Sequence, residues 1–179
     1  PKSAMAHYLA AMAHSGKRNV QQAKTELAEA VKLNPKWDEP KILLAQISLR
    51  EGNDAQAVES LKEVLKDHPH NIQAHTLLGN TYLAKRKIPE AAKAYEEVIR
   101  IAPNSPVGYT QMGRVLFLQK KEKEAVAQLE KALSLQPNHV DALQLIVAYH
   151  MSQKDVKKAL ERVEQQVKIA PKNPLFYSM

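Results

Sequence analysis

Apolar residues recur along this chain at helical spacing, and the whole pattern repeats every 34 residues. One apolar column contains Leu27, Leu61, Tyr95, Leu129 and Val163, and the column four residues further on contains Val31, Leu65, Ile99, Leu133 and Val167. Side chains four residues apart lie on the same face of an α-helix. The pattern therefore predicts one buried helical face in each 34-residue unit.

Prolines mark the boundaries of these units, because every 34th residue is a proline: Pro1, Pro35, Pro69, Pro103, Pro137 and Pro171. We place this proline at position 32, which gives units over 4–37, 38–71, 72–105, 106–139 and 140–173, with a further helix beginning over 174–179. We expect helix A at about positions 1–14 and helix B at about positions 17–30, because the proline lacks an N–H donor and ends helix B. Four other prolines fall in the first turn of predicted helices, where a missing N–H costs nothing: Pro40, Pro89, Pro106 and Pro174.

Two columns of small residues indicate where helices A and B cross. Position 20 is always alanine, and position 8 contains Ala11, Ala45, Gly79, Gly113 and Val147. Two antiparallel helices approach closely only where the facing side chains are small. Each unit is therefore predicted to be an antiparallel helical hairpin.

This alignment resembles the tetratricopeptide repeat family over essentially the whole chain. The third unit carries the resemblance best, through Leu78, Gly79, Tyr82, Ala91, Tyr95 and Pro103 in the signature positions of the family. Departures are the absence of tryptophan at position 4 in every unit and Gln166 at position 27, where the family has a small residue. The resemblance implies an all-α fold, a right-handed superhelical α-solenoid of antiparallel helix hairpins, as one domain over 1–179. Because both ends fall inside a unit, we expect the chain to be part of a longer array.

The resemblance also implies a concave, partner-binding groove lined by helix A positions 2, 5, 6, 9, 12 and 13. From these positions we select as candidate groove residues Met5, Tyr8, Met12, Ile42, Gln46, Leu49, Thr76, Asn80, Leu83, Thr110, Gln111, Arg114, Phe117, Gln144 and Met151. Methionine and aromatic side chains with a few amides suit an amphipathic helix or an extended peptide. An alternative is that some of the apolar residues in this region, such as Leu9, Leu43, Leu77 and Leu118, are core between neighbouring A helices.

Chaperone-binding relatives hold a peptide's terminal carboxylate with a set of lysine, asparagine and arginine side chains. From the third unit onward only Asn80 matches that set, because Thr76, Gln111, Asp141 and Leu145 occupy the other positions. The sequence therefore disfavours binding of the acidic tail of a chaperone.

The turns between helices A and B are rich in lysine and arginine. Candidate residues for a basic edge are Lys85, Arg86, Lys87, Lys120 and Lys121, in a chain of formal net charge +7. This edge would attract an acidic partner. The alternative is that these residues only keep exposed turns polar, and acidic residues lie among these cations. Nucleic acid is disfavoured, because no aromatic side chains alternate with the cations to stack on bases.

Catalytic and metal-binding patterns are missing from the sequence. Zero cysteines exclude thiolate chemistry, and no glycine-rich phosphate loop, HExxH or GxSxG motif occurs. His7, His14, His75 and His150 fall at positions 4 and 11, where the family places packing aromatics. We therefore predict no enzyme activity, cofactor or metal site. The apolar runs are far shorter than the roughly 20 residues that cross a bilayer.

The leading hypothesis is a non-catalytic scaffold that binds a peptide or protein segment in the groove. Two alternatives stay open: an assembly component of a bacterial envelope or exopolysaccharide-export machine, and a substrate-recruiting arm of a larger enzyme. Unsealed repeat ends would also allow copies of the chain to stack on one another. The sequence is compatible with a bacterial periplasm and with a cytoplasm, and it favours neither.

Overall fold

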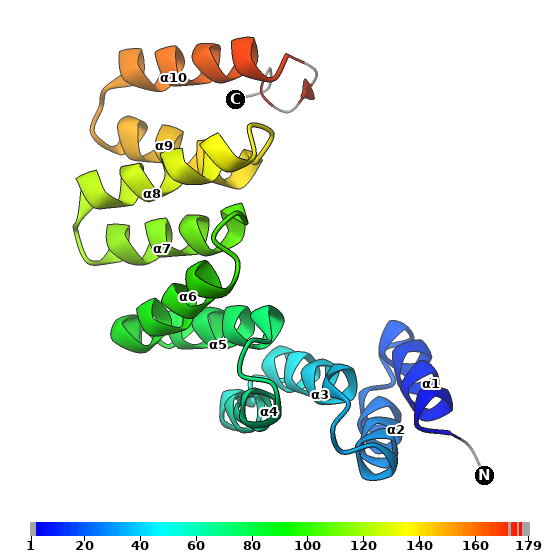
Figure 1. Ribbon diagram of the computed structural model, residues 1–179. Helices are drawn as coiled ribbons and strands as arrows, with labels where there is room; N and C mark the ends of the chain where they lie inside the picture. The colour runs from blue at the N-terminus through cyan, green and yellow to red at the C-terminus, as the bar shows by residue number, and fades with distance from the viewer. Residues whose placement is uncertain (1–2, 172, 175, 177–179) are drawn as a thin grey trace. The chain divides into compact units, whose positions relative to one another are not determined.

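A computed structural model describes residues 3–171, 173, 174 and 176. This part of the chain contains α-helices and no β-strand (Figure 1). The A helices are α1 (Ala4–Gly16), α3 (Asp38–Arg50), α5 (Ile72–Ala84), α7 (Pro106–Leu118) and α9 (Val140–Ser152). The B helices are α2 (Val20–Leu33), α4 (Asp54–Asp67), α6 (Ile88–Ile101), α8 (Glu122–Leu135) and α10 (Val156–Ile169). None of the helices in the described ranges has the length and apolar character needed to span a bilayer.

The predicted positions of the helices are confirmed. Each A helix occupies positions 1–13 of its unit, and each B helix occupies positions 17–30. The turn between them has the same backbone in all five units, because one residue in each turn has a positive φ: Arg18, Gly52, Arg86, Lys120 and Lys154. In the first unit the N–H of Asn19 then donates to the carbonyl of His14 over 2.9 Å, a bond typical of helix C-caps that use a left-handed residue.

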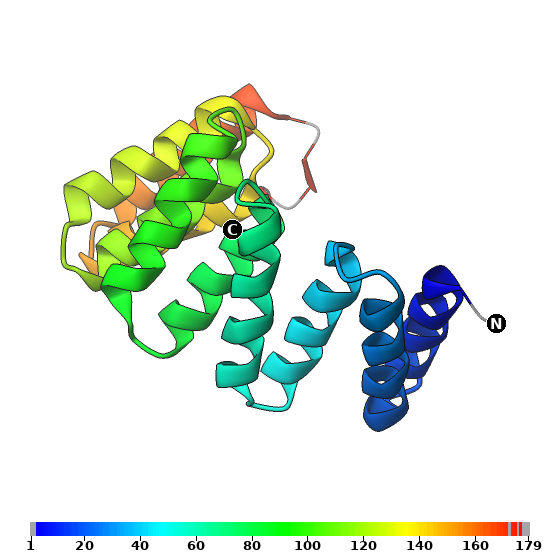
Figure 2. The ribbon, with the colours of Figure 1, turned by 60° about the horizontal axis from the view of Figure 1, so that its bottom comes forward.

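The chain forms two compact units, which divide between Lys85 and Arg86. We call them the N-terminal unit and the C-terminal unit, and each is larger than the numbered 34-residue units of the repeat. The N-terminal unit contains the hairpins α1/α2 and α3/α4, and α5 lies against α4 and α3 (Figure 2). In the C-terminal unit α6 packs against α7 of the hairpin α7/α8, and α8 and α7 contact α9 of the hairpin α9/α10 (Figure 1).

The small residues lie at the helix crossings, as predicted. All five alanines at position 20 are buried, with at most 3% of their surface exposed. In the fourth hairpin, a Cβ atom added to Gly113 would lie 2.8 Å from Cγ of Leu129 and 3.4 Å from the carbonyl oxygen of Ala125. Only glycine therefore fits at this crossing without displacing Leu129.

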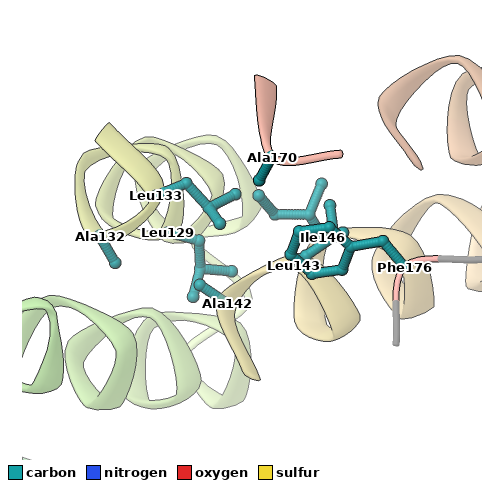
Figure 3. Packing of buried hydrophobic residues seen from close by; sticks show 8 residues of the cluster. All are labelled: Leu129, Ala132, Leu133, Ala142, Leu143, Ile146, Ala170 and Phe176. Carbon is teal, nitrogen blue, oxygen red and sulfur yellow. The ribbon is translucent and has the colours of Figure 1, made fainter. Parts of the chain in front are cut away.

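A hydrophobic cluster in the C-terminal unit joins α8, α9 and the segment after α10. Leu129 and Leu133 of α8 meet Leu143 and Ile146 of α9, and Phe176 lies beside these α9 residues with 1% of its surface exposed (Figure 3). The further helix predicted over 174–179 falls largely outside the described residues. In that segment the structure describes Phe176, whose side chain covers the core of the last two hairpins.

Polar side chains bind the turns that contain the repeated prolines. At position 4, His75 donates from Nε2 to the carbonyl of Pro69 over 2.9 Å, and the Tyr109 hydroxyl donates to the carbonyl of Pro103 over 3.0 Å. The fifth unit has a leucine at position 4, and there Gln166 Nε2 donates to the carbonyl of Pro137 over 2.6 Å. In the third, fourth and fifth 34-residue units the departures from the family pattern thus serve related purposes, because each supplies a partner for a turn carbonyl.

Candidate functional site

Three large apolar side chains stand exposed in a row on α1. Met5, Leu9 and Met12 have 53%, 56% and 49% of their surface exposed. They are spaced by four and three residues, so they share one face of the helix. Two of the three are predicted groove residues, and Leu9 is the one for which a core role was the alternative.

An aromatic pair adjoins this row. The rings of Tyr8 and Trp37 lie 4.9 Å apart and are tilted by 59°. A hollow of about 190 Å³ beside them is lined by Ala4, Met5, Asn34 and Trp37. The N-terminal unit therefore offers an apolar surface with a small recess that an aliphatic side chain could fill.

The other predicted groove residues of the N-terminal unit differ in exposure. Asn80 is exposed, and those partly buried are Gln46, Leu49, Thr76 and Leu83. Ile42 is only 4% exposed, so the structure places it in the core and removes it from the surface. The position of a residue in a helix gives the direction of its side chain, but the packing of neighbouring helices determines how much of that side chain is covered.

In the C-terminal unit the predicted residues lie on α7 and α9, which contact each other. Gln144 and Met151 are exposed on α9, and Gln111, Arg114 and Phe117 are partly buried on α7. The ring of Phe117 stacks on Tyr149 of α9, with centroids 5.3 Å apart and an angle of 28°. The structure thus brings the two helices together through an aromatic pair whose α9 member was not among the predicted residues.

The groove prediction is also wrong for Thr110, because this residue is 2% exposed and lies in the core. Its hydroxyl donates to the carbonyl of Pro106, one turn earlier in α7, over 2.9 Å. A threonine that satisfies its hydroxyl within its own helix is free to face the core. Leu118, for which a core role was the alternative, is instead 59% exposed.

Arg114 is the single charged residue of α7. Its guanidinium approaches Asp141 of α9 at 3.9 Å, with the two side chains 40% and 61% exposed. Burial raises the pKa of Tyr95, and the positive charge of Arg114 partly offsets that rise. Arg114 therefore lies between the packed ring of Tyr95 and the open surface at Asp141.

The predicted basic-edge residues are all exposed: Lys85, Arg86, Lys87, Lys120 and Lys121. Two of them are paired, because Lys85 lies 3.0 Å from Asp54 and Lys121 lies 3.9 Å from Glu124. Lys85 is the C-cap of α5, where the helix dipole favours a cation, whereas Lys87 and Lys121 are the N-caps of α6 and α8, where it does not. Helix capping and neighbouring carboxylates thus account for Lys85, and a carboxylate lies near Lys121, without a partner chain.

Several surface residues were missed by the groove prediction. Trp37 and Tyr149 lie in a turn and at position 10, outside the positions that the family resemblance supplied. Their pairing with Tyr8 and Phe117 is the signal that identifies them, and it depends on distances between helices. Among the described residues, no three histidine, aspartate or glutamate side chains converge in a way that would hold a metal ion.

Chains of similar fold are known among solved structures. MamA from Desulfovibrio magneticus RS-1 superposes with a TM-score of 0.78 at 18% identity, covering 97% of this chain and 98% of that one. TTC0263, a thermophilic TPR protein of Thermus thermophilus, gives 0.71 at 21% identity, covering 98% and 96%. YrrB, described as a TPR protein with an unusual peptide-binding site, gives 0.68 at 17% identity, covering 98% and 91%. No curated protein sequence matches the chain.

Models of the tetratricopeptide repeat match residues 4–36, 48–111 and 116–179. The matched ranges include most of every hairpin, and they agree with the confirmed positions of the helices. This chain belongs to the tetratricopeptide repeat family.

Proposed function

We propose that this chain is a non-catalytic scaffold that binds a peptide or protein segment on the exposed face of its A helices. The proposal rests on the positions of the large apolar side chains that remain exposed. Among the described residues, those on A helices are Met5, Leu9, Met12, Ile72, Val107, Leu118 and Met151. Within the same described ranges, the B helices α4, α6 and α8 have none, and those on α2 and α10 are Leu33, Val156, Leu160 and Ile169.

In the part of the chain that the structure describes, such side chains occur on four A helices, with none on α3, and on two B helices. Exposed apolar side chains that gather mainly on the A helices indicate a surface that a partner covers. Burying one methionine or leucine side chain contributes about 1.5–3 kcal/mol. The three such side chains on α1 are already about half covered, so covering the rest would contribute about 2–5 kcal/mol, which is part of the free energy of binding a short helix or an extended segment. Methionines adapt their shape to different partners, which suits a surface that accepts a segment of peptide chain.

Two further points support a scaffold. Proteins of this family generally bind other proteins, and the similarly folded YrrB is described as having a peptide-binding site. The exposed polar residues between the apolar ones, such as Gln144 and Asn80, are amides that can bind a peptide backbone. A fold alone does not define a function, so the surface residues must carry the test.

Selection from a phage-displayed random peptide library tests the proposal. The selected peptides should bind the native chain and lose most of their affinity, at least about tenfold, for a variant with Met5→Glu, Met12→Glu and Met151→Glu, because charge on the surface prevents apolar burial.

The matched control is a variant with Leu33→Glu, Val156→Glu and Leu160→Glu. These apolar residues are 52%, 50% and 58% exposed, similar to the first set, but they lie on B helices. Peptides should bind this variant as well as they bind the native chain. Equal loss in both variants, or no loss in either, would show that the A-helix surface is not the binding site.

A further inference from the structure

Arg114 is a cation with unused hydrogen-bonding capacity on the proposed binding surface. A guanidinium has five N–H donors in a planar fork. The Nε atom of Arg114 is buried and has no acceptor among the residues that the structure describes. The 3.9 Å approach to Asp141 is too long for a hydrogen bond. A ligand cannot reach the buried Nε, but the side chain is 40% exposed, so a ligand can reach the rest of the guanidinium.

The surroundings of Arg114 are suited to a ligand that is part charged and part apolar. Gln111, Phe117 and Leu118 lie three or four residues from Arg114 in α7, so they share its side of the helix. Gln111 offers an amide, Phe117 a partly exposed ring and Leu118 an exposed aliphatic side chain. A carboxylate at Arg114 would thus lie beside a place for an apolar side chain.

We infer that Arg114 receives a carboxylate from the bound segment, through paired N–H···O bonds from its two terminal nitrogens, Nη1 and Nη2. A carboxylate is the acceptor whose two oxygens match this fork. The inference rests on the proposed function, because it names the chemistry that the same surface selects.

Asp141 is the competitor in this site. It is 61% exposed, and an exposed ion pair without a hydrogen bond is weak. An incoming carboxylate can therefore displace Asp141, but the charge of Asp141 repels the ligand at short range. Asp141→Asn should strengthen binding of an acidic ligand several-fold, whereas Asp141 would be irrelevant if Arg114 bound nothing.

The site differs from the carboxylate-binding set of the chaperone-binding relatives. Arg114 is at position 9 of the fourth unit, and that set is largely absent from this chain. For that reason the sequence disfavours binding of the acidic tail of a chaperone. The proposed site leaves that prediction as it stands, because it uses a single arginine and not the set of side chains that holds a chaperone tail.

Nuclear magnetic resonance on the full chain tests the inference at the arginine itself. Three peptides serve as probes: acetyl-Leu-Glu-Leu-amide, with a side-chain carboxylate; acetyl-Leu-Gln-Leu, with a terminal carboxylate; and acetyl-Leu-Gln-Leu-amide, which is neutral. The Nε–H signal of Arg114 is assigned by its loss in Arg114→Lys. The ε-methyl signal of Met151 reports contact with the apolar surface.

We expect at least one acidic peptide to shift the Arg114 signal and to bind about tenfold more tightly than the neutral peptide. The peptide that does so identifies the source of the carboxylate. Arg114→Gln should remove this preference, so that acidic and neutral peptides bind with equal affinity, with an unaltered thermal unfolding curve as the control for folding.

The inference is wrong if no acidic peptide shifts the Arg114 signal, or if the neutral peptide shifts it equally. If the Met151 signal moves in that case, the surface still binds peptide and only the carboxylate site fails. If neither signal moves with any probe, the inference fails, and the library selection separately decides whether the surface binds peptides at all.

Discussion

Gly113 determines how closely α7 approaches α8. A Cβ atom at this position would lie 2.8 Å from Cγ and Cδ2 of Leu129, which is fully buried and has little room to move. Gly16, the last residue of α1, has no atom within 4 Å of an added Cβ. The two glycines therefore separate the effect of packing from the general preference of helices for alanine.

We expect Gly113→Ala to be less stable than Gly16→Ala by about 1–3 kcal/mol, the usual cost of overpacking a core. Both substitutions gain similar helix propensity, so that term largely cancels in the comparison. Urea unfolding followed by circular dichroism measures the difference. Equal unfolding midpoints would mean that Leu129 moves aside freely and that the crossing is not tightly packed.

At the scale of single residues, the sequence predicted the role of the small residues better than it predicted which side chains lie at the surface. The glycine and alanine columns identified the crossings, because close approach of two helices depends on side-chain size alone. Thr110 was assigned to the groove, yet its hydroxyl bonds to its own helix and it lies in the core. Arg114 was selected from its position, but its unpaired Nε and its distance to Asp141 depend on packing between α7 and α9.

At the scale of helices, a polar network connects α10 to α8 and to the turn before α9. Arg162 bonds to both carboxylate oxygens of Glu130 at 2.7 and 2.9 Å, and its Nη1 donates to Oε1 of Gln166 over 2.9 Å. Gln166 in turn donates to the carbonyl of Pro137. Gln166 is 1% exposed, so each of its polar atoms needs these partners.

Gln166→Ala should lower the free energy of unfolding by about 1–3 kcal/mol, because it leaves the Pro137 carbonyl and an Arg162 donor without their partner. Gln165→Ala is the matched control, since Gln165 is exposed on the same helix and should change stability by less than about 0.5 kcal/mol. Thermal or urea unfolding of both variants provides the comparison. A neutral Gln166→Ala would show that water replaces the glutamine at no cost.

Helix boundaries were predictable because local signals determine them. Pro106 begins α7 and Pro137 follows α8, and these residues act through their own backbone whatever the rest of the chain does. The network around Gln166 could not be predicted, because it joins residues up to 32 positions apart in the sequence. The same glutamine appeared in the sequence only as a departure from the family pattern.

At the scale of the whole molecule, stability in a repeat array is approximately a sum of hairpin terms and neighbour terms. The contacts within each compact unit agree with this view, because they run between adjacent helices and adjacent hairpins. A local loss of packing should therefore remain local. Phe176 provides a test, because it covers the cluster of Leu129, Leu143 and Ile146 at one end of the chain.

Phe176→Ala should destabilise the last two hairpins by up to about 3–5 kcal/mol, the range for removing a buried phenylalanine. Amide hydrogen exchange should accelerate strongly in α8, α9 and α10 and remain nearly unchanged in α1 and α2. Phe176→Leu keeps part of the apolar contact and should give a smaller acceleration in the same helices. If exchange in α1 and α2 accelerated to the same extent, the chain would unfold as one cooperative body, and the sum of local terms would not describe it. If exchange stayed unchanged everywhere, Phe176 would contribute no packing energy despite its burial.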